Sequence, residues 1–142
     1  MELGLVMSDY LFSYGTLLPR HAPDEIKSVV TRLTPCGEGW IPGVLFALCD
    51  YPGARFDSSL NTKVFGAIFR LPDGVNILRE LDHYEGFDPA SPSTSLFVRK
   101  LYPVVLTTGG SLECWVYEFN GHPTPSRVLH DGRYSKGDRV AD

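Results

Sequence analysis

Residues 10–14 carry an aromatic side chain at every second position, which predicts a short strand with two distinct faces that ends at Gly15. Residues 64–71 are apolar almost throughout and rich in β-formers, as in a central strand covered on both faces. Residues 37–48 predict a further strand, broken at Pro42-Gly43 in the manner of a bulge or an edge.

The remaining β pattern lies in the second half of the chain. Residues 96–106 and 112–120 predict two strands, joined by the turn 107–111 in a β-hairpin. The segment 50–53 predicts a loop. The segment 88–95, with two prolines and four serines or threonines, is typical of a mobile loop or lid.

Two helices interrupt these strands. Apolar positions recur at spacings of three and four in residues 24–33, which predicts a short amphipathic helix. The same spacing predicts a helix from Val75 to Glu85, closed by Gly86, a residue suited to a left-handed cap. Because the elements do not follow a βαβα order, we expect an α+β domain with a strongly curved antiparallel or mixed sheet.

Composition narrows the classes of function. The 142 residues point to a single domain, with a core at about residues 9–120 and a loosely ordered tail at 121–142. A formal net charge of -4 offers no basic surface for nucleic acid, and the N-terminal residues predict neither a signal peptide nor a membrane span. Cys36, Cys49 and Cys114 fit no disulfide framework or metal knuckle, so we expect free thiols and a cytoplasmic location.

Glu85 is the most informative single residue. It follows Leu81 by four positions and Leu78 by seven, so it falls within the apolar arc of its helix. A carboxylate there must be paired, protonated or facing a cavity, and burial would raise its pKa toward that of a useful general base. The alternative is that the helix frays at Gly86 and Glu85 turns to solvent.

The segment from Tyr14 to Leu18 is the second candidate for chemistry. A strand stops at Gly15 with no immediate helix, which leaves successive backbone N–H groups free to bind an anion of carboxylate size. An ordinary turn at a strand end is the alternative. Dinucleotide and nucleoside-triphosphate motifs are absent from the sequence, and its four histidines have no metal-ligand spacing.

Four sequence segments together resemble one known family. They read LFSYGTL at 11–17, YPG at 51–53, VFGAIFRL at 64–71 and LDHYEGF at 81–87. This combination resembles the gamma-glutamylcyclotransferase-like family, which includes the AIG2-like proteins, over about residues 9–119. The resemblance implies a compact mixed β-barrel flanked by short helices, with a cavity at the mouth of the barrel.

The resemblance also implies a reaction. In active members, the α-amine of a γ-glutamyl group attacks its own γ-carbonyl, which closes the ring of 5-oxoproline and expels an amine. Glu85 corresponds to the general acid and base. The backbone of Tyr14, Gly15, Thr16 and Leu17 corresponds to the loop that holds the substrate carboxylate. No metal or organic cofactor is implied.

One position departs from the pattern of the family. Phe97-Val98-Arg99 stands where relatives often have Tyr-x-Arg, so Phe97 would meet the substrate without a hydroxyl. We expect a small-molecule γ-glutamyl ligand, no nucleic-acid or membrane partner, and a monomer or weak homodimer. The alternative to an enzyme is a binding or regulatory module with the same fold, and a third possibility uses Glu85 as the base for water in amide cleavage.

Overall fold

The computed structural model describes residues 8–15, 24–48, 51–72 and 75–134. Within them, the strands and α-helices are, in chain order, β1 (Tyr10–Ser13), α1 (Asp24–Val30), β2 (Thr34–Ala47), β3 (Pro52–Phe56), β4 (Lys63–Arg70), α2 (Val75–Glu85), β5 (Phe97–Leu106) and β6 (Ser111–Phe119). Short 3₁₀ turns occupy Pro92–Thr94 and Pro125–Arg127. The helix expected at 75–85 and the hairpin of β5 and β6 are confirmed.

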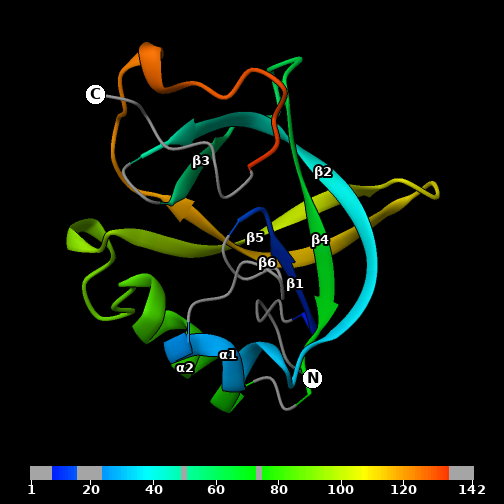
Figure 1. Ribbon diagram of the computed structural model, residues 1–142, viewed down its shortest axis with the longest axis vertical. Coiled ribbons are helices and arrows are strands. Elements are labelled where there is room, and N and C mark those ends of the chain that lie inside the picture. The colour runs from blue at the N-terminus through cyan, green and yellow to red at the C-terminus, as the bar shows by residue number, and fades with distance from the viewer. Residues whose placement is uncertain (1–7, 16–23, 49–50, 73–74, 135–142) are drawn as a thin grey trace, which may run out of the picture.

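The strands form a closed mixed barrel (Figure 1). Their order is β3-β2-β4-β1-β6-β5, and an additional pairing of β2 with β5 closes five of them into the barrel, with β3 added beside β2. All pairs are antiparallel except β1 with β6. The predicted fold class, a mixed β-barrel with short helices, is therefore confirmed, and β4 is a central strand as expected.

β2 is continuous, and the expected break at Pro42-Gly43 is wrong. The strand changes partner there instead: pairing with β4 ends at Pro42, and pairing with β3 begins at Gly43. The irregularity of β2 lies between Pro35 and Gly37. Pro42 is tolerated because it stands where the hydrogen bonds between β2 and β4 stop.

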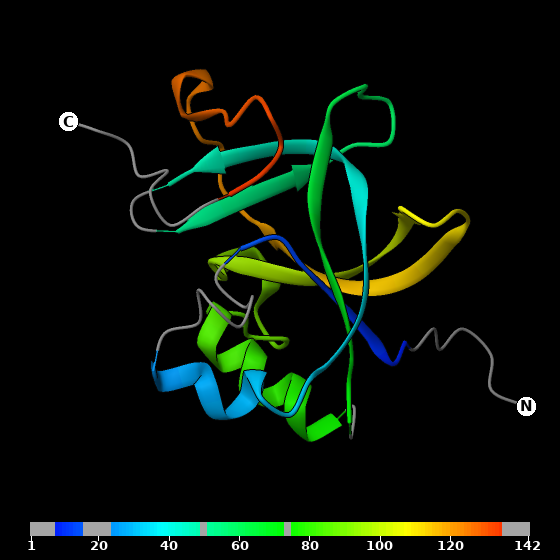
Figure 2. The same ribbon diagram turned by 45° about the vertical axis from the view of Figure 1, so that its right-hand side comes forward.

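Two hydrophobic cores share the wall of the barrel. Phe12, Ile68 and Val116 belong to the core inside the barrel. Leu11 and Phe69, their neighbours in β1 and β4, belong to a second core with residues of α1 and α2. Figure 2 shows both helices on one side of the barrel, where they cover this second core. Neither α-helix is long and apolar enough to cross a membrane.

Three expected loops have more structure than the sequence indicated. The loop expected at 50–53 is wrong from Pro52 onward, where β3 begins. In the segment 88–95, the side-chain amide of Asn120 donates to three backbone carbonyls, so the segment is fixed to the end of β6. Residues 121–134 were expected to be loosely ordered, yet Leu129 N–H donates to Leu45 O and Phe65 N–H to Gly132 O. The rest of the tail, 135–142, lies outside the described residues.

Candidate active site

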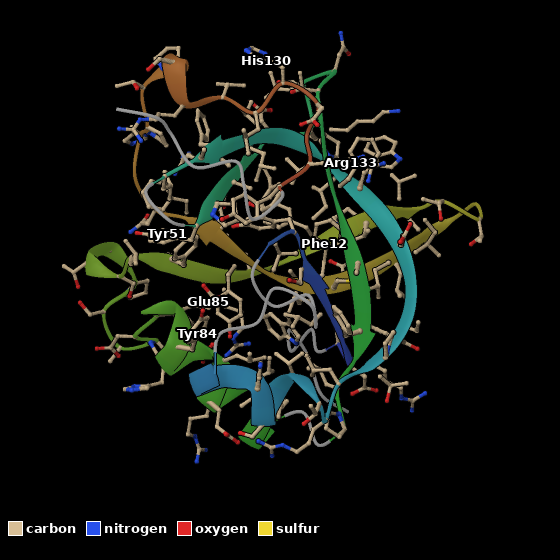
Figure 3. The ribbon with its side chains drawn as sticks, in the orientation of Figure 1. Phe12, Tyr51, Tyr84, Glu85, His130 and Arg133 are labelled. Atoms are coloured by element: carbon tan, nitrogen blue, oxygen red, sulfur yellow. The ribbon has the colours of Figure 1, made fainter. Side chains whose placement is uncertain are left out.

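A cavity of about 190 Å3 lies between the end of α2 and one end of the barrel. Residues from five segments line it: Phe12, Ser13, Tyr14 and Gly15; Tyr51 and Pro52; Tyr84 and Glu85; Leu96 and Phe97; Tyr117. In Figure 3, Glu85 stands at the end of α2 beside Tyr84, and Tyr51 lies on the barrel side. The cavity therefore joins the two parts of the sequence that carried candidate chemistry, the Gly15 segment and Glu85.

The end of α2 holds Glu85 toward this cavity. Gly86 has a φ of 72°, the left-handed conformation expected of the cap. Phe87 N–H donates to the backbone oxygen of Asp82 at 2.9 Å, and Leu96 N–H donates to Gly86 O at 3.0 Å. The helix end is fixed on both sides of Gly86, and the carboxylate lines the cavity instead of turning to solvent.

The environment of Glu85 favours its protonated form. Within the part of the chain that the structure describes, its carboxylate has no hydrogen-bond or ion-pair partner, and the accessible part of the side chain opens on the cavity. Burial raises the pKa of the Glu85 carboxyl to about 8. A cationic group entering the cavity would supply the missing partner and stabilise the carboxylate.

Tyr14 ties the end of β1 to two other strands. Its hydroxyl donates to the backbone oxygen of Tyr117 in β6 and accepts from Ala54 N–H in β3 at 3.2 Å. Burial and then the nearby charge of Glu85 raise the pKa of Tyr14 well above its ordinary value, so it remains a donor. The side chain of Tyr14 therefore has a structural contact that sequence reasoning did not anticipate.

Gly15 brings the backbone close to the start of β3. A Cβ at this position would overlap the ring of Pro52, so the close approach requires glycine. Thr16 and Leu17, the other expected members of the loop, lie outside the described residues.

Phe97 lies at the cavity and is buried. Its ring packs against Tyr51, at 6.1 Å between ring centroids, and against Phe119, at 5.5 Å. Aromatic and aliphatic carbon forms much of this wall. Phe97 therefore adds an aromatic ring without a hydroxyl to this wall, and its contact with a ligand stays a prediction.

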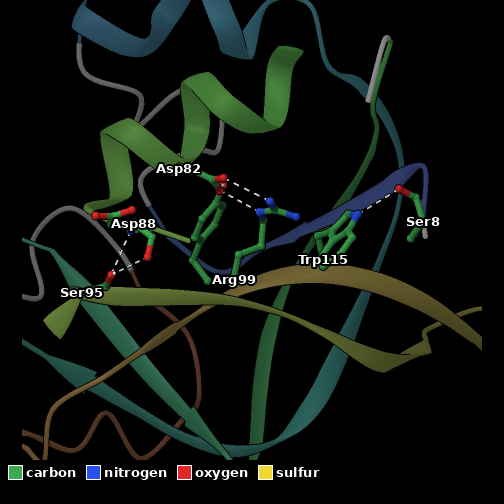
Figure 4. Close-up of polar contacts among 7 residues, drawn as sticks. Ser8, Asp82, Asp88, Ser95, Arg99 and Trp115 are labelled. Carbon is green, nitrogen blue, oxygen red and sulfur yellow. Dashed lines mark hydrogen bonds and ion pairs between the residues drawn. The ribbon is translucent and has the colours of Figure 1, made fainter. Parts of the chain in front are cut away.

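A buried ionic cluster stands directly behind the cavity and was missed in the sequence. Asp82 is buried, and its carboxylate accepts from Arg99 Nε at 2.7 Å and from the hydroxyl of Tyr117 at 2.6 Å. Figure 4 shows Asp82 and Arg99 facing each other between α2 and β5, with Trp115 beside them. The helical spacing could have indicated that Asp82 is buried, because Asp82 follows Leu78 by four residues and so lies beside the same apolar arc of the helix.

The described residues offer no metal centre. Within residues 8–15, 24–48, 51–72 and 75–134, no group of three or more His, Cys, Asp or Glu side chains could hold a metal ion. Cys36 is exposed and Cys114 is buried, both as free thiols, and Cys49 lies outside the described residues. Among the described residues that line the cavity, Glu85 carries the only carboxylate.

Comparison with solved structures places the fold among known proteins. An AIG2-like protein from Mus musculus matches with a TM-score of 0.67 and 22% identity over 89% of this chain and 88% of that chain. An uncharacterized protein from Pyrococcus horikoshii matches with a TM-score of 0.58 and 16% identity over 89% of both chains. A gamma-glutamyl cyclotransferase matches with a TM-score of 0.58 and 14% identity over 78% of this chain and 65% of that chain.

Sequence comparison assigns the family. A search of curated protein sequences finds no significant match. The sequence model of the family described as gamma-glutamyl cyclotransferase, AIG2-like, matches residues 11–136, which include β1 after Tyr10 and every residue that lines the cavity. The chain therefore belongs to the gamma-glutamyl cyclotransferase, AIG2-like family.

Proposed function

We propose that the protein is a cyclotransferase that converts a γ-glutamyl amine, amino acid or conjugate to 5-oxoproline and a free amine. The observation that carries this proposal is the Glu85 carboxylate, which lines a cavity without a partner among the described residues and faces the same space as Gly15. Membership of the family supports the general class of reaction.

The proposed substrate pose uses the two candidate groups at the cavity, the segment that begins at Tyr14 and the Glu85 carboxylate. The α-carboxylate of the γ-glutamyl group binds the backbone N–H groups of the segment from Tyr14 to Leu17. The α-ammonium lies against Glu85, where it gives the carboxylate a partner that none of the described residues supplies. Holding both α-substituents fixes the side chain of the γ-glutamyl group so that its γ-carbonyl can reach the nitrogen.

The proposed chemistry needs one proton carrier. Glu85 takes a proton from the α-ammonium, and the resulting amine attacks the γ-carbonyl carbon to form a C–N bond. The bond from that carbon to the leaving nitrogen then breaks, and Glu85 returns the proton to the departing amine. A base with a pKa of about 8 suits this exchange near neutral pH. The attack is intramolecular, so positioning supplies much of the acceleration.

The test is product formation from a panel of γ-glutamyl amines, γ-glutamyl amino acids and glutathione-like conjugates. We expect 5-oxoproline from at least one of them, measured by mass spectrometry, and its loss in Glu85→Gln. Glu80→Gln is the matched control, because Glu80 lies on the exposed face of the same helix and pairs with Arg32. No 5-oxoproline from any compound, or undiminished product from Glu85→Gln, would contradict the proposal.

A binding module of the same fold is the second candidate. The aromatic wall at Tyr51 and Phe97 favours it, since that wall can hold a ligand whether or not chemistry follows. Thermal stabilisation by γ-glutamyl compounds without any product would assign this function. Release of free glutamate in place of 5-oxoproline would instead identify Glu85 as a base for water.

A further inference from the structure

We propose that Asp82 and Arg99 are positioning residues, which hold Glu85 and the wall of the cavity in place through Tyr117 and the last turn of α2. This inference rests on the proposed function of Glu85. Neither residue carries a proton in the reaction described above. Asp82 and Arg99 fix the Glu85 carboxylate relative to the substrate. Their opposite charges also neutralise each other behind the cavity wall.

The guanidinium of Arg99 donates two hydrogen bonds to the carboxylate of Asp82. Nε of Arg99 lies 2.7 Å from Oδ1 of Asp82, and Nη2 lies 3.1 Å from Oδ2. The guanidinium also stacks on the ring of Trp115, with 4.4 Å from its central carbon to the ring centroid. This paired and stacked geometry restricts both side chains, because guanidinium and carboxylate are planar groups that match each other.

Tyr117 connects this pair to the cavity. Its hydroxyl donates to Oδ1 of Asp82 at 2.6 Å, and Tyr117 is also one of the residues that line the cavity. Burial and then the hydrogen bond to Asp82 hold the pKa of Tyr117 far above its ordinary value, so it stays a donor. The backbone oxygen of Tyr117 accepts from Tyr14. Contacts thus run without a gap from Arg99 to Tyr14, which directly follows β1 and precedes Gly15.

Asp82 also holds the helix turn that carries Glu85. Its backbone oxygen accepts from Phe87 N–H, and its carboxylate is attached to β5 and β6, so both parts of the residue fix the end of α2. Glu85 lies three residues later, within one helical turn. If the carboxylate of Asp82 were lost, the side-chain attachment of this turn to the sheet would be lost with it.

Asp82 and Arg99 carry opposite charges, so their effects on the ionisation of Glu85 can be distinguished. Among the described residues, the ionisable groups that line this cavity with it are Tyr84 on α2, Tyr117 on β6, Tyr14 after β1 and Tyr51 before β3, and the pair of Asp82 on α2 and Arg99 on β5 lies behind Tyr117. Arg99 neutralises Asp82. Removing Arg99 leaves a negative charge that opposes ionisation of Glu85, whereas removing the charge of Asp82 leaves a positive one that favours it.

The two charge variants, Arg99→Gln and Asp82→Asn, therefore give opposite expectations. Each should lower kcat by roughly ten- to a hundredfold, with a smaller change in KM, because the reacting groups are misplaced. The rising limb of kcat/KM against pH should move to higher pH in Arg99→Gln and to lower pH in Asp82→Asn. The pair Arg32→Gln and Glu80→Gln, which breaks an exposed ion pair between the turn after α1 and helix α2, should leave rate and pH profile unchanged.

A second measurement works without turnover. Titration of the Glu85 carboxyl by 13C NMR should show the same opposite displacements in the two variants, and exchange of the Phe87 amide should be faster in Asp82→Asn. Displacements in the same direction, or none in properly folded variants, would overturn the proposal. Inactivity of the wild-type protein toward every γ-glutamyl compound would overturn the proposed function alone, since the titration still reports on positioning.

Two further variants distinguish a loss of positioning from a failure to fold: the conservative Arg99→Lys, and Arg99→Ala tested with an added cation. Arg99→Lys keeps the charge but not the paired hydrogen bonds, so we expect it to keep the pH profile and lose rate. Arg99 borders a surface hollow of about 870 Å3 together with Phe87 and Trp115, which gives a small cation access to the vacated position in Arg99→Ala. Methylguanidinium should restore part of the rate in Arg99→Ala and none in Glu85→Gln. No restoration in a folded Arg99→Ala would contradict the proposal.

Discussion

The hydroxyl of Tyr14 donates to the backbone oxygen of Tyr117, 103 positions later in the chain. The same hydroxyl accepts from Ala54 N–H, so a single buried atom joins the end of β1 to β6 and β3. Gly15 follows immediately. The segment that begins at Tyr14 is proposed to bind the substrate carboxylate. Tyr14 attaches this segment to β6, the strand in which Tyr117 contacts Asp82.

Replacing Tyr14 by Phe should weaken both the fold and substrate binding. The change leaves a buried carbonyl and a buried N–H without this partner, which costs about 1 to 3 kcal/mol of unfolding free energy. We expect KM to rise more than kcat falls. Urea denaturation and steady-state kinetics measure the two effects. Tyr10→Phe, in the same strand, is the control and should change neither.

The pH dependence should follow Glu85. Because the carboxyl has a pKa of about 8, most of it is protonated in the free protein at neutral pH, and kcat/KM should rise with pH until about pH 8. A bound ammonium group favours the carboxylate, so the corresponding limb of kcat should lie at lower pH than that of kcat/KM. Equal positions of the two limbs would contradict an ammonium beside Glu85.

Stability should respond to the same residue with a defined sign. The folded pKa of Glu85, about 8, exceeds its ordinary value of 4.5, so the folded state binds the proton more tightly. The contribution of Glu85 is fully favourable below about pH 4.5 and is lost as pH rises through 8. Glu85→Gln should therefore be more stable than the wild type at pH 9, by about 2 to 4 kcal/mol, and nearly equal at pH 4. Chemical denaturation at both pH values measures this difference, and an equal gap at both would contradict it.

Gly15→Ala should damage the mouth of the cavity by a steric route. The added methyl group overlaps the ring of Pro52, which forces the two segments apart and costs about 1 to 3 kcal/mol. We expect a raised KM and reduced stability. Pro52→Ala removes the overlapping ring atoms, so the double variant should lose less than the sum of the two single variants. Strict additivity in this cycle would place the cause elsewhere.

Local patterns along the sequence predicted most elements but not how they join. Helical spacing placed α2 and put Glu85 on its inner face, because periodicity is a property of a single element. Closure of the barrel by β2 and β5 pairs Gly39 with Leu106, a choice of partner that no local pattern encodes. β3 was missed because Pro52-Gly53 has the composition of a turn, and its hydrogen bonds come from β2.

The candidate site divides in the same way. Glu85 was recognisable because a carboxylate stood on an apolar arc. The role of Asp82 depends on Arg99, 17 residues away, and on Tyr117, 35 residues away, so its burial and pairing become visible only when the elements are assembled. The tail was expected to be loosely ordered from its polarity, whereas the docking of residues 128–132 uses backbone atoms, which composition does not report.

The parallel pairing of β1 with β6 has a consequence for folding. β1 is one of the first strands made, yet it lies between β4 and β6 and aligns Leu11 with Trp115. A ribosome must therefore release almost the whole domain before β1 can gain its second neighbour. Contacts that span so much sequence slow folding, since the loop must close before the contact stabilises it. Because the cavity needs residues from both strands, we expect it to be completed late in folding.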